Sequence, residues 1–163
     1  MASRFENLPQ RRAIIDRRAI ADELAALAPG DVTAMRQSAT ALLSRALAEG
    51  RAEIARRLAE HPSRGLEAAA AQAFMIDQII RLLYDFITER LYPKPNATTS
   101  ERITLIAVGG YGRGEMAPYS DVDIGFLTPW KQTAWSEQVI ESMLYSLWDL
   151  GLKIGHSSRS LDE

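Results

Sequence analysis

The sequence predicts an α+β fold, in which a helical segment precedes a small mixed sheet with its own helices. Apolar residues recur at helical spacing up to about residue 92. Proline and small polar residues then interrupt this pattern over 93–102. Short apolar runs rich in β-branched residues follow and indicate strands. We therefore expect a helical segment over 1–92, a linker over 93–102 and an α/β core over 103–163.

The helical segment is expected to contain three helices. The first ends at Pro29-Gly30, and Asp31 is a suitable N-cap for the second. Gly50 is expected to interrupt the second helix, and residues 61–63 break the chain before the third. The third helix carries one apolar stripe, formed by Ala69, Ala73, Ile76, Ile80, Leu83 and Ile87.

The core is expected to begin with a buried strand over Ile103–Val108, followed by a second strand over Val122–Leu127. An amphipathic helix over Thr133–Leu150 and a third strand over Leu152–Ser157 complete it. The third strand would leave an uncovered sheet edge, so we expect the core to be incomplete at its C-terminal end and the chain to be part of a longer protein. Side chains expected in the interior are Trp130, Trp135, Val139, Met143, Leu147 and Trp148.

Composition argues against several classes of function. The formal net charge of −2 provides no overall attraction to nucleic acid or to an anionic membrane, so neither partner is expected. No apolar run approaches the length of a membrane span. The absence of cysteine rules out disulfides and thiolate chemistry and is compatible with the reducing cytoplasm, where we expect the protein to act.

Four glycines gather directly after the first expected strand, at Gly109, Gly110, Gly112 and Gly114. Glycine lets the backbone approach a ligand closely, and N–H groups at a strand-to-helix corner bind phosphate. A plain tight turn needs only one or two glycines, so this density favours a phosphate-binding loop. The loop lacks the Gly-Lys-Ser/Thr ending of a P-loop, and Glu115 stands where a dinucleotide fingerprint has its third glycine.

An Asp-x-Asp pair, Asp121 and Asp123, lies at the start of the second expected strand. Alternation along a strand directs both carboxylates to one face, while Val122 and Ile124 face the core. Two neighbouring carboxylates suit Mg²⁺, which binds through one or two carboxylates together with substrate phosphates. Taken alone, such a pair is more often a solvated strand end or turn. Beside the glycine loop, it indicates chemistry on a nucleoside triphosphate.

Side chains around the two motifs have open interpretations. Arg113 would either point at the β,γ-phosphates or pair with Glu115 on the surface. Ser120 would either bond a phosphate or close the turn before the strand. Tyr111 and Tyr119 are expected to pack within the loop rather than to stack on a base.

These residues resemble the signature of a known superfamily. Gly109-Gly110 followed by Asp121-Val122-Asp123 is similar to the signature of the DNA polymerase β-type nucleotidyltransferases. Within that superfamily, the chain resembles the bifunctional uridylyltransferase/uridylyl-removing enzymes of bacterial nitrogen regulation. This closer resemblance covers most of the chain and rests on the string GGYGRGEMAPYSDVDIGFL, on 12–18, on 77–81 and on 148–157.

The resemblance implies a polymerase β-like nucleotidyltransferase core that transfers UMP from UTP to a tyrosine of the signal protein PII, with Mg²⁺ and release of pyrophosphate. By position, Asp121 and Asp123 would be the catalytic metal ligands. In that family, UMP removal and glutamine sensing belong to other domains, so neither is expected of these residues. The nucleotide-binding residues would be Gly109 and Gly110, which cradle the triphosphate, with Gly112, Arg113 and Ser120 as further candidates.

Two departures from the family pattern bear on activity. Gly125 stands where members often have a larger aliphatic residue, on the face of both aspartates, so it would widen the site or weaken the strand. Polymerase-like transferases usually add a third carboxylate on a following strand, and Leu152–Ser157 carries none. That group is missing, replaced by water, or supplied beyond Glu163. His156, on the same strand, would either orient substrate or be structural.

Two other functions stay open on the sequence. One is another transferase of the same superfamily, which adds AMP to a protein or modifies a small molecule such as an aminoglycoside. The other is a catalytically inert nucleotide-binding module. Base preference would separate the first from a uridylyltransferase, and metal-dependent turnover would separate the second.

Overall fold

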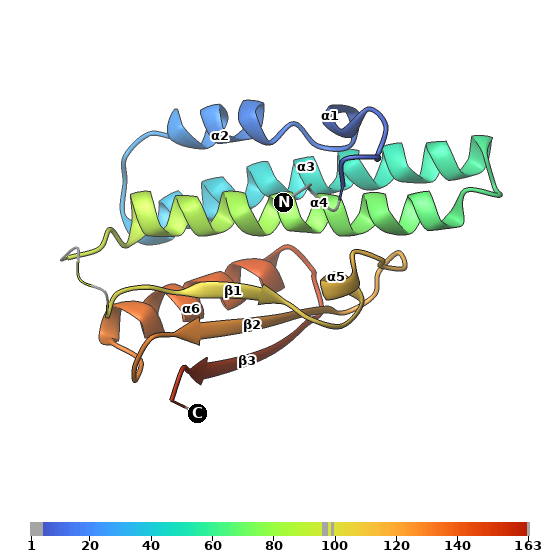
Figure 1. Ribbon diagram of the computed structural model, residues 1–163. Helices are drawn as coiled ribbons and strands as arrows, with labels where there is room; N and C mark the ends of the chain where they lie inside the picture. Colours follow the sequence, from blue (N-terminus) through green and yellow to red (C-terminus); the bar gives the residue numbers. More distant parts are fainter. Residues whose placement is uncertain (1–4, 96–97, 99, 163) are drawn as a thin grey trace.

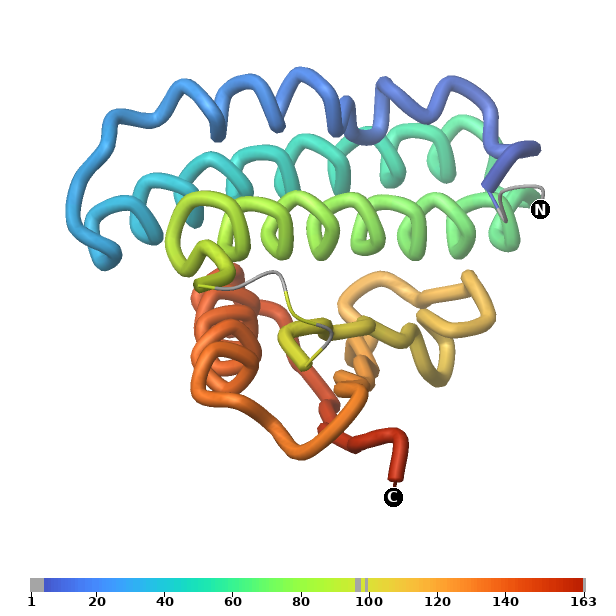
Figure 2. The backbone as a smooth tube through the Cα atoms, turned by 60° about the vertical axis from the view of Figure 1, so that its left-hand side comes forward, coloured from blue at the N-terminus to red at the C-terminus, as the bar shows by residue number. Residues whose placement is uncertain are grey.

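The computed structural model describes residues 5–95, 98 and 100–162, and its helices and three-stranded mixed sheet confirm the α+β class. Helices α3 and α4 form a hairpin, with α1 and α2 on one side and the sheet with α6 on the other (Figures 1 and 2). In chain order the elements are α1 (Arg11–Ile14), α2 (Arg17–Ala25), α3 (Val32–Glu60), α4 (Gly65–Phe86), the π-helical turn η1 (Ile87–Leu91), β1 (Thr104–Ala107), α5 (Gly109–Arg113), β2 (Val122–Thr128), α6 (Ala134–Asp149) and β3 (Ile154–Ser160). No helix among the described residues has the length and apolar character needed to cross a membrane.

Helix α3 begins where the sequence predicts but is not interrupted. The Asp31 carboxylate accepts a hydrogen bond from the Ala34 N–H at 2.8 Å, which confirms the predicted N-cap. The expected break at Gly50 is wrong, because α3 continues to Glu60. A Cβ at position 50 would lie 2.5 Å from Met75 Sδ and 2.9 Å from the Ile14 carbonyl oxygen. Gly50 therefore serves close packing against neighbouring elements rather than a turn.

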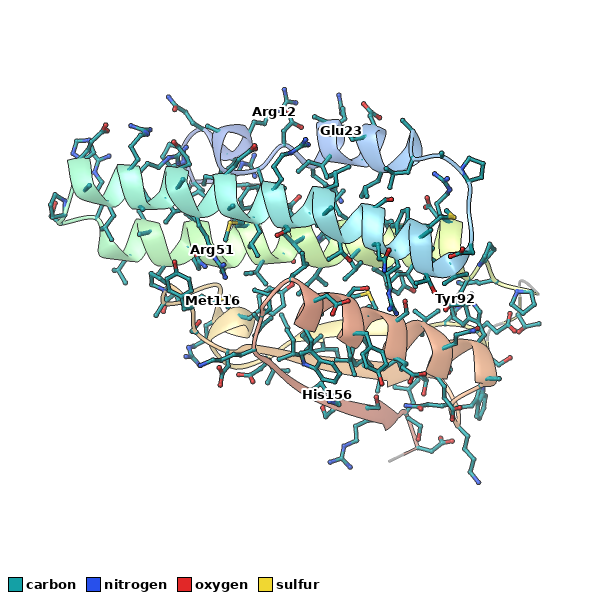
Figure 3. The ribbon with its side chains drawn as sticks, turned by 180° about the vertical axis from the view of Figure 1, so that it is seen from behind. Arg12, Glu23, Arg51, Tyr92, Met116 and His156 are labelled. Carbon is teal, nitrogen blue, oxygen red and sulfur yellow. The ribbon has the colours of Figure 1, made fainter. Side chains whose placement is uncertain are left out.

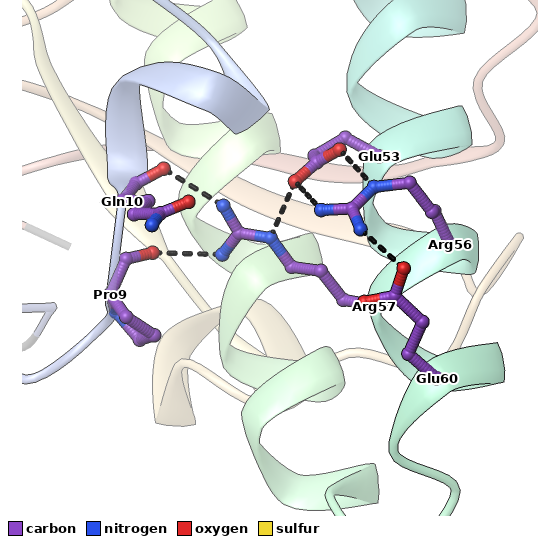
Figure 4. A network of polar contacts seen from close by, with 6 residues as sticks. All are labelled: Pro9, Gln10, Glu53, Arg56, Arg57 and Glu60. Carbon is purple, nitrogen blue, oxygen red and sulfur yellow. Dashed lines mark hydrogen bonds and ion pairs between the residues drawn. The ribbon is translucent and has the colours of Figure 1, made fainter.

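A network of arginine and glutamate side chains fixes the chain before α1 onto α3 (Figure 4). The Arg57 guanidinium donates to the carbonyl oxygens of Pro9 and Gln10 at 2.8 and 2.9 Å. Its Nε donates to Glu53 at 2.8 Å, and Arg56 donates to the same carboxylate and to Glu60. Glu53 therefore holds both guanidinium groups in place.

Glu53 should make stability depend on pH in the acid range. Hydrogen bonds from Arg56 and then Arg57 lower the pKa of its carboxyl to about 2, from an ordinary value of 4.5. A lowered folded-state pKa stabilises the fold above the ordinary value, and this contribution is lost as the pH falls toward 2. In urea titrations, the free energy of unfolding of Glu53→Gln should lie below that of the wild type by a constant amount above about pH 5. The gap should shrink at lower pH, and a gap independent of pH would contradict this role for Glu53.

Helix α4 carries the predicted apolar stripe into the interior. Of the stripe residues in α4, Ala73, Ile76, Ile80 and Leu83 are buried and Ala69 is half-buried, and the last stripe residue, Ile87, is buried at the start of η1. After α4, Arg90 donates to the carbonyl oxygens of Leu24 and Leu27 at 3.2 and 2.9 Å. Such carbonyls at a helix end have no partner within the helix, so Arg90 closes the C-terminal end of α2.

The described residues of 93–102 form neither helix nor strand. Asn96, Ala97 and Thr99 of this expected linker lie outside the described residues, as does Glu163. After it, β1 pairs antiparallel with β2, and β2 pairs parallel with β3. The strand predicted over Ile103–Val108 is present, but only one of its faces packs against the core, through Leu105 and Ala107. Ile106 and Val108 are 42% and 48% exposed, on the sheet face opposite the core.

Helix α6 and the strand after it follow the prediction closely. Thr133 caps α6, and its apolar stripe of Trp135, Val139, Met143 and Leu147 is buried. Gly151 has a φ of 76° and ends the turn that leads to β3. The expected burial of Trp130 and Trp148 is wrong, since their side chains are 57% and 45% exposed. Trp130 lies in the loop before α6, and Trp148 lies on the face of α6 beside the buried stripe.

Candidate active site

The glycine loop, residues 109–114, turns directly away from β1 and begins beside Asp123. The Val108 N–H donates to the Asp123 carbonyl oxygen at 3.0 Å, which continues the pairing of β1 with β2 up to the loop. Gly109 then takes a left-handed backbone with φ 58°, a conformation that other residues adopt only with strain. The loop closes as the short helix α5, whose C-cap Gly114 is also left-handed, with φ 75°.

The Asp123 carboxylate lies between two glycines from different elements. A Cβ on Gly109 would lie 2.6 Å from Asp123 Oδ2, and a Cβ on Gly155 would overlap Oδ1. The parallel register of β2 and β3 places Gly155 directly beside Asp123. Any side chain at either glycine would therefore displace the carboxylate. The sequence analysis missed Gly155, although a glycine inside an expected strand is a signal of close approach by another group.

The two aspartates differ in their surroundings. Asp123 is half-buried within β2, and its neighbours Val122 and Ile124 are only 1% and 2% exposed, so the predicted alternation is confirmed. Asp121 is exposed and directly precedes the strand. The Ser120 N–H donates to the Ala117 carbonyl oxygen at 3.2 Å, closing the turn before Asp121.

The remaining residues of the glycine loop are packed against its own backbone. A Cβ on Gly110 would lie 2.9 Å from the Glu115 carbonyl oxygen, and one on Gly112 would lie 2.7 Å from the Ala107 carbonyl oxygen. These two glycines thus allow the close backbone packing of the tight turn. Arg113 is exposed, and in the described part of the chain no ion pair joins it to Glu115.

The two loop tyrosines occupy different environments. Tyr111 is buried and its hydroxyl donates to Asp77 Oδ1 at 3.1 Å, which agrees with the predicted loop packing. Tyr119 is 74% exposed, and the Arg51 guanidinium carbon lies 4.8 Å from its ring centroid. Tyr119 therefore contacts helix α3 rather than the interior of the loop.

On the aspartate face of the sheet, β3 contributes two small residues and then Arg159, which is beside Leu127. Gly155 is beside Asp123, and Ser157 is beside Gly125. His156 pairs with Ile124 on the other face, where its ring centroid lies 6.3 Å from that of Trp148, on the side of α6 (Figure 3). His156 therefore points away from Asp123 and fits the structural interpretation.

The two carboxylates at this site suit a magnesium ion that is also bound by water and phosphate. They are too few for a metal held by protein ligands alone. Among the described residues, no group of three or more His, Cys, Asp and Glu side chains could enclose a metal ion. Mg²⁺ commonly uses one or two carboxylates and takes its other ligands from water and phosphate. Asp121 and Asp123 supply two carboxylates. Gly109 and Gly155, which flank the Asp123 oxygens, have no side chains that could cover them.

Comparison with known proteins agrees with this geometry. Residues 94–155 match the family described as nucleotidyltransferase domain. A bifunctional uridylyltransferase/uridylyl-removing enzyme of Novosphingobium aromaticivorans is 56% identical over 96% of this chain and 17% of its own length. The enzymes of that name from Erythrobacter litoralis and Rhodospirillum rubrum are 49% and 50% identical over 96% and 94% of this chain. No solved structure matches the chain.

The chain spans about a sixth of the length of these relatives, since it covers 17% of each. The similarity nevertheless runs through both the helices before the linker and the sheet with the glycine loop. It also includes the matched domain, which contains Gly109, Asp123 and Gly155. The chain therefore carries a nucleotidyltransferase domain, and over nearly its whole length it is similar to a part of the bifunctional uridylyltransferase/uridylyl-removing enzymes.

Proposed function

We propose that this chain carries the site that transfers UMP from UTP to a tyrosine of the PII signal protein, with release of pyrophosphate. The observation that carries the proposal is the Asp123 carboxylate, fixed between Gly109 and Gly155 at the start of a glycine loop. In the proposal, a triphosphate would approach the backbone of the glycine loop beside this carboxylate. The name uridylyltransferase, shared by the relatives above, supports a uridine nucleotide as donor.

In the proposed reaction, Asp121 and Asp123 would hold Mg²⁺, and Gly109 and Gly110 would bind the triphosphate. Bound Mg²⁺ would neutralise the charge that develops on the reacting phosphates. Gly112 would leave the loop backbone without a side chain, Arg113 at the end of α5 would contribute a cation, and Ser120 before β2 would contribute a hydroxyl. The tyrosine oxygen would attack the α-phosphorus in line, its proton would pass to water, and the bond to the β,γ-pyrophosphate would break, so that pyrophosphate leaves. Catalysis would come from positioning and charge neutralisation.

The proposal assigns different tasks to the two parts of the chain. Residues 103–163 would form the transferase core, and residues 1–92 the helical segment that supports it, joined by the linker over 93–102. The reaction would take place in the cytoplasm, where nucleoside triphosphates are supplied. The alternative of an inert nucleotide-binding module is favoured by one observation: Gly155 and Ser157, rather than a carboxylate, stand on β3 beside Asp123 and Gly125.

The test is transfer of label from α-labelled UTP to purified PII, with and without Mg²⁺, by this chain and by a longer chain of the same protein. Asp123→Asn serves as the negative control. Mg²⁺-dependent labelling by this chain would support the proposal and show that the residues present suffice. Labelling only by the longer chain would identify this chain as an inactive part of the transferase. Failure of both, with ATP or another acceptor working instead, would reject UTP and PII as substrates.

A further inference from the structure

Helix α4 contacts the glycine loop through a buried tyrosine. Tyr111 is the buried residue of α5, and its hydroxyl donates to Asp77 Oδ1 at 3.1 Å. Asp77 belongs to α4, which lies outside the matched nucleotidyltransferase domain over 94–155. In Figure 1, α5 lies just below α4, so the contact joins the helical layer to the start of the site.

Asp77 is itself held in one orientation. Its second oxygen, Oδ2, accepts from Arg81 Nε at 2.8 Å and from Gln78 Nε2 at 3.0 Å. The Asp77 side chain is 19% exposed, whereas that of Arg81 is 58% exposed. The exposed ion pair alone is of small energetic value. The ion pair matters for the orientation of Asp77, because it holds Oδ2 and leaves Oδ1 directed to Tyr111.

A second contact holds the other end of the loop on the same helix. The Met116 N–H donates to the Ala69 carbonyl oxygen at 3.1 Å, and Met116 is buried beneath the helical layer (Figure 3). Ala69 and Asp77 are separated by about 12 Å along an α-helix at 1.5 Å per residue. Helix α4 therefore holds the chain at Tyr111 and again at Met116, on either side of Arg113 and Gly114.

We propose that Asp77 and Tyr111 are positioning residues, which set the glycine loop against the Asp123 carboxylate, so that helix α4 takes part in nucleotide transfer. This inference rests on the proposed function for its effect on rate. Without the hydroxyl contact, α5 keeps its apolar packing but loses the bond that fixes its rotation. The backbone of Gly109 and Gly110 then shifts relative to Asp123, and small displacements of reacting groups lower rates strongly.

The test compares Tyr111→Phe, which keeps the ring, with Asp77→Ala and with the double variant. Each should lower kcat for UMP transfer by about 10- to 100-fold at a temperature well below unfolding. The double variant should be no worse than either single one, because both remove the same contact. Asp77→Asn keeps an acceptor oxygen and should restore part of the rate. Tyr84→Phe, which removes another hydroxyl that contacts backbone beneath α4, is the matched control and should retain the full rate.

A second readout does not require transfer. In proton–nitrogen correlation spectra, the amide signals of Gly109, Gly110 and Gly112 should move in Tyr111→Phe and Asp77→Ala, and stay in place in Tyr84→Phe. Glycine signals that stay in place in all variants would overturn the proposal. If the wild-type protein neither binds nor transfers a uridine nucleotide, the proposed function fails on its own, and the glycine signals still decide whether this pair sets the loop.

Discussion

Replacing Gly155 by alanine is expected to lower Mg²⁺-dependent transfer about 100-fold or more, close to the loss in Asp123→Asn. The added methyl group would overlap Oδ1 of Asp123, while Oδ2 lies on the side of Gly109, where an added Cβ would be 2.6 Å away. The carboxylate must then rotate away from the position that the two glycines define. The rate should be measured as label transfer from α-labelled UTP, in whichever length of chain is active.

Two control variants separate this effect from general damage to the strand. Ser157→Ala alters an exposed residue of β3 on the same face, and Gly65→Ala adds a methyl group where no atom lies within 4 Å. Both should keep the melting temperature of the wild type, and Gly65→Ala should also keep its rate. If Gly155→Ala transfers UMP normally while remaining folded, the position of Asp123 between the glycines is not needed for activity.

Local patterns were sufficient to predict the motifs and the starts of α3 and α6. The caps Asp31 and Thr133 lie at or beside the predicted boundaries, because a cap depends on residues within one turn. The proximity of the glycine loop to Asp123 also follows from local order, since the loop and the next strand are neighbours in sequence. The strand alternation that buries Val122 and Ile124 is local in the same way.

The predictions that failed depend on contacts between distant segments. Glycine at position 50 is typical of a helix interruption, but in α3 it is explained by close packing against Met75 on another helix. The exposure of Ile106 arises because only one face of β1 packs against the core. Gly155 acquires its importance only from the register of β3 with β2. No periodicity within one segment contains that information.

Trp135→Ala is expected to be the most destabilising of the tryptophan substitutions on α6. The Trp135 side chain is 6% exposed, its Nε1 donates to the Tyr92 carbonyl oxygen at 2.8 Å, and the Lys94 ammonium lies 5.4 Å from its ring centroid. Truncating a buried tryptophan costs about 3–5 kcal/mol of unfolding free energy. For a chain of this length, that loss corresponds to a melting temperature lower by roughly 6–20 °C.

Trp148→Ala is the matched comparison, because it removes the same side chain from the same helix. Trp148 is 45% exposed and has edge-on contacts with Tyr145 and His156, at centroid distances of 5.6 and 6.3 Å. Its loss should cost about 1 kcal/mol or less in urea titrations, as for most surface changes. A cost equal to that of Trp135→Ala would mean that the three aromatic rings hold β3 against α6. In that case the position of Gly155, and with it that of Asp123, would depend on the exposed side of this helix as well as on its buried stripe.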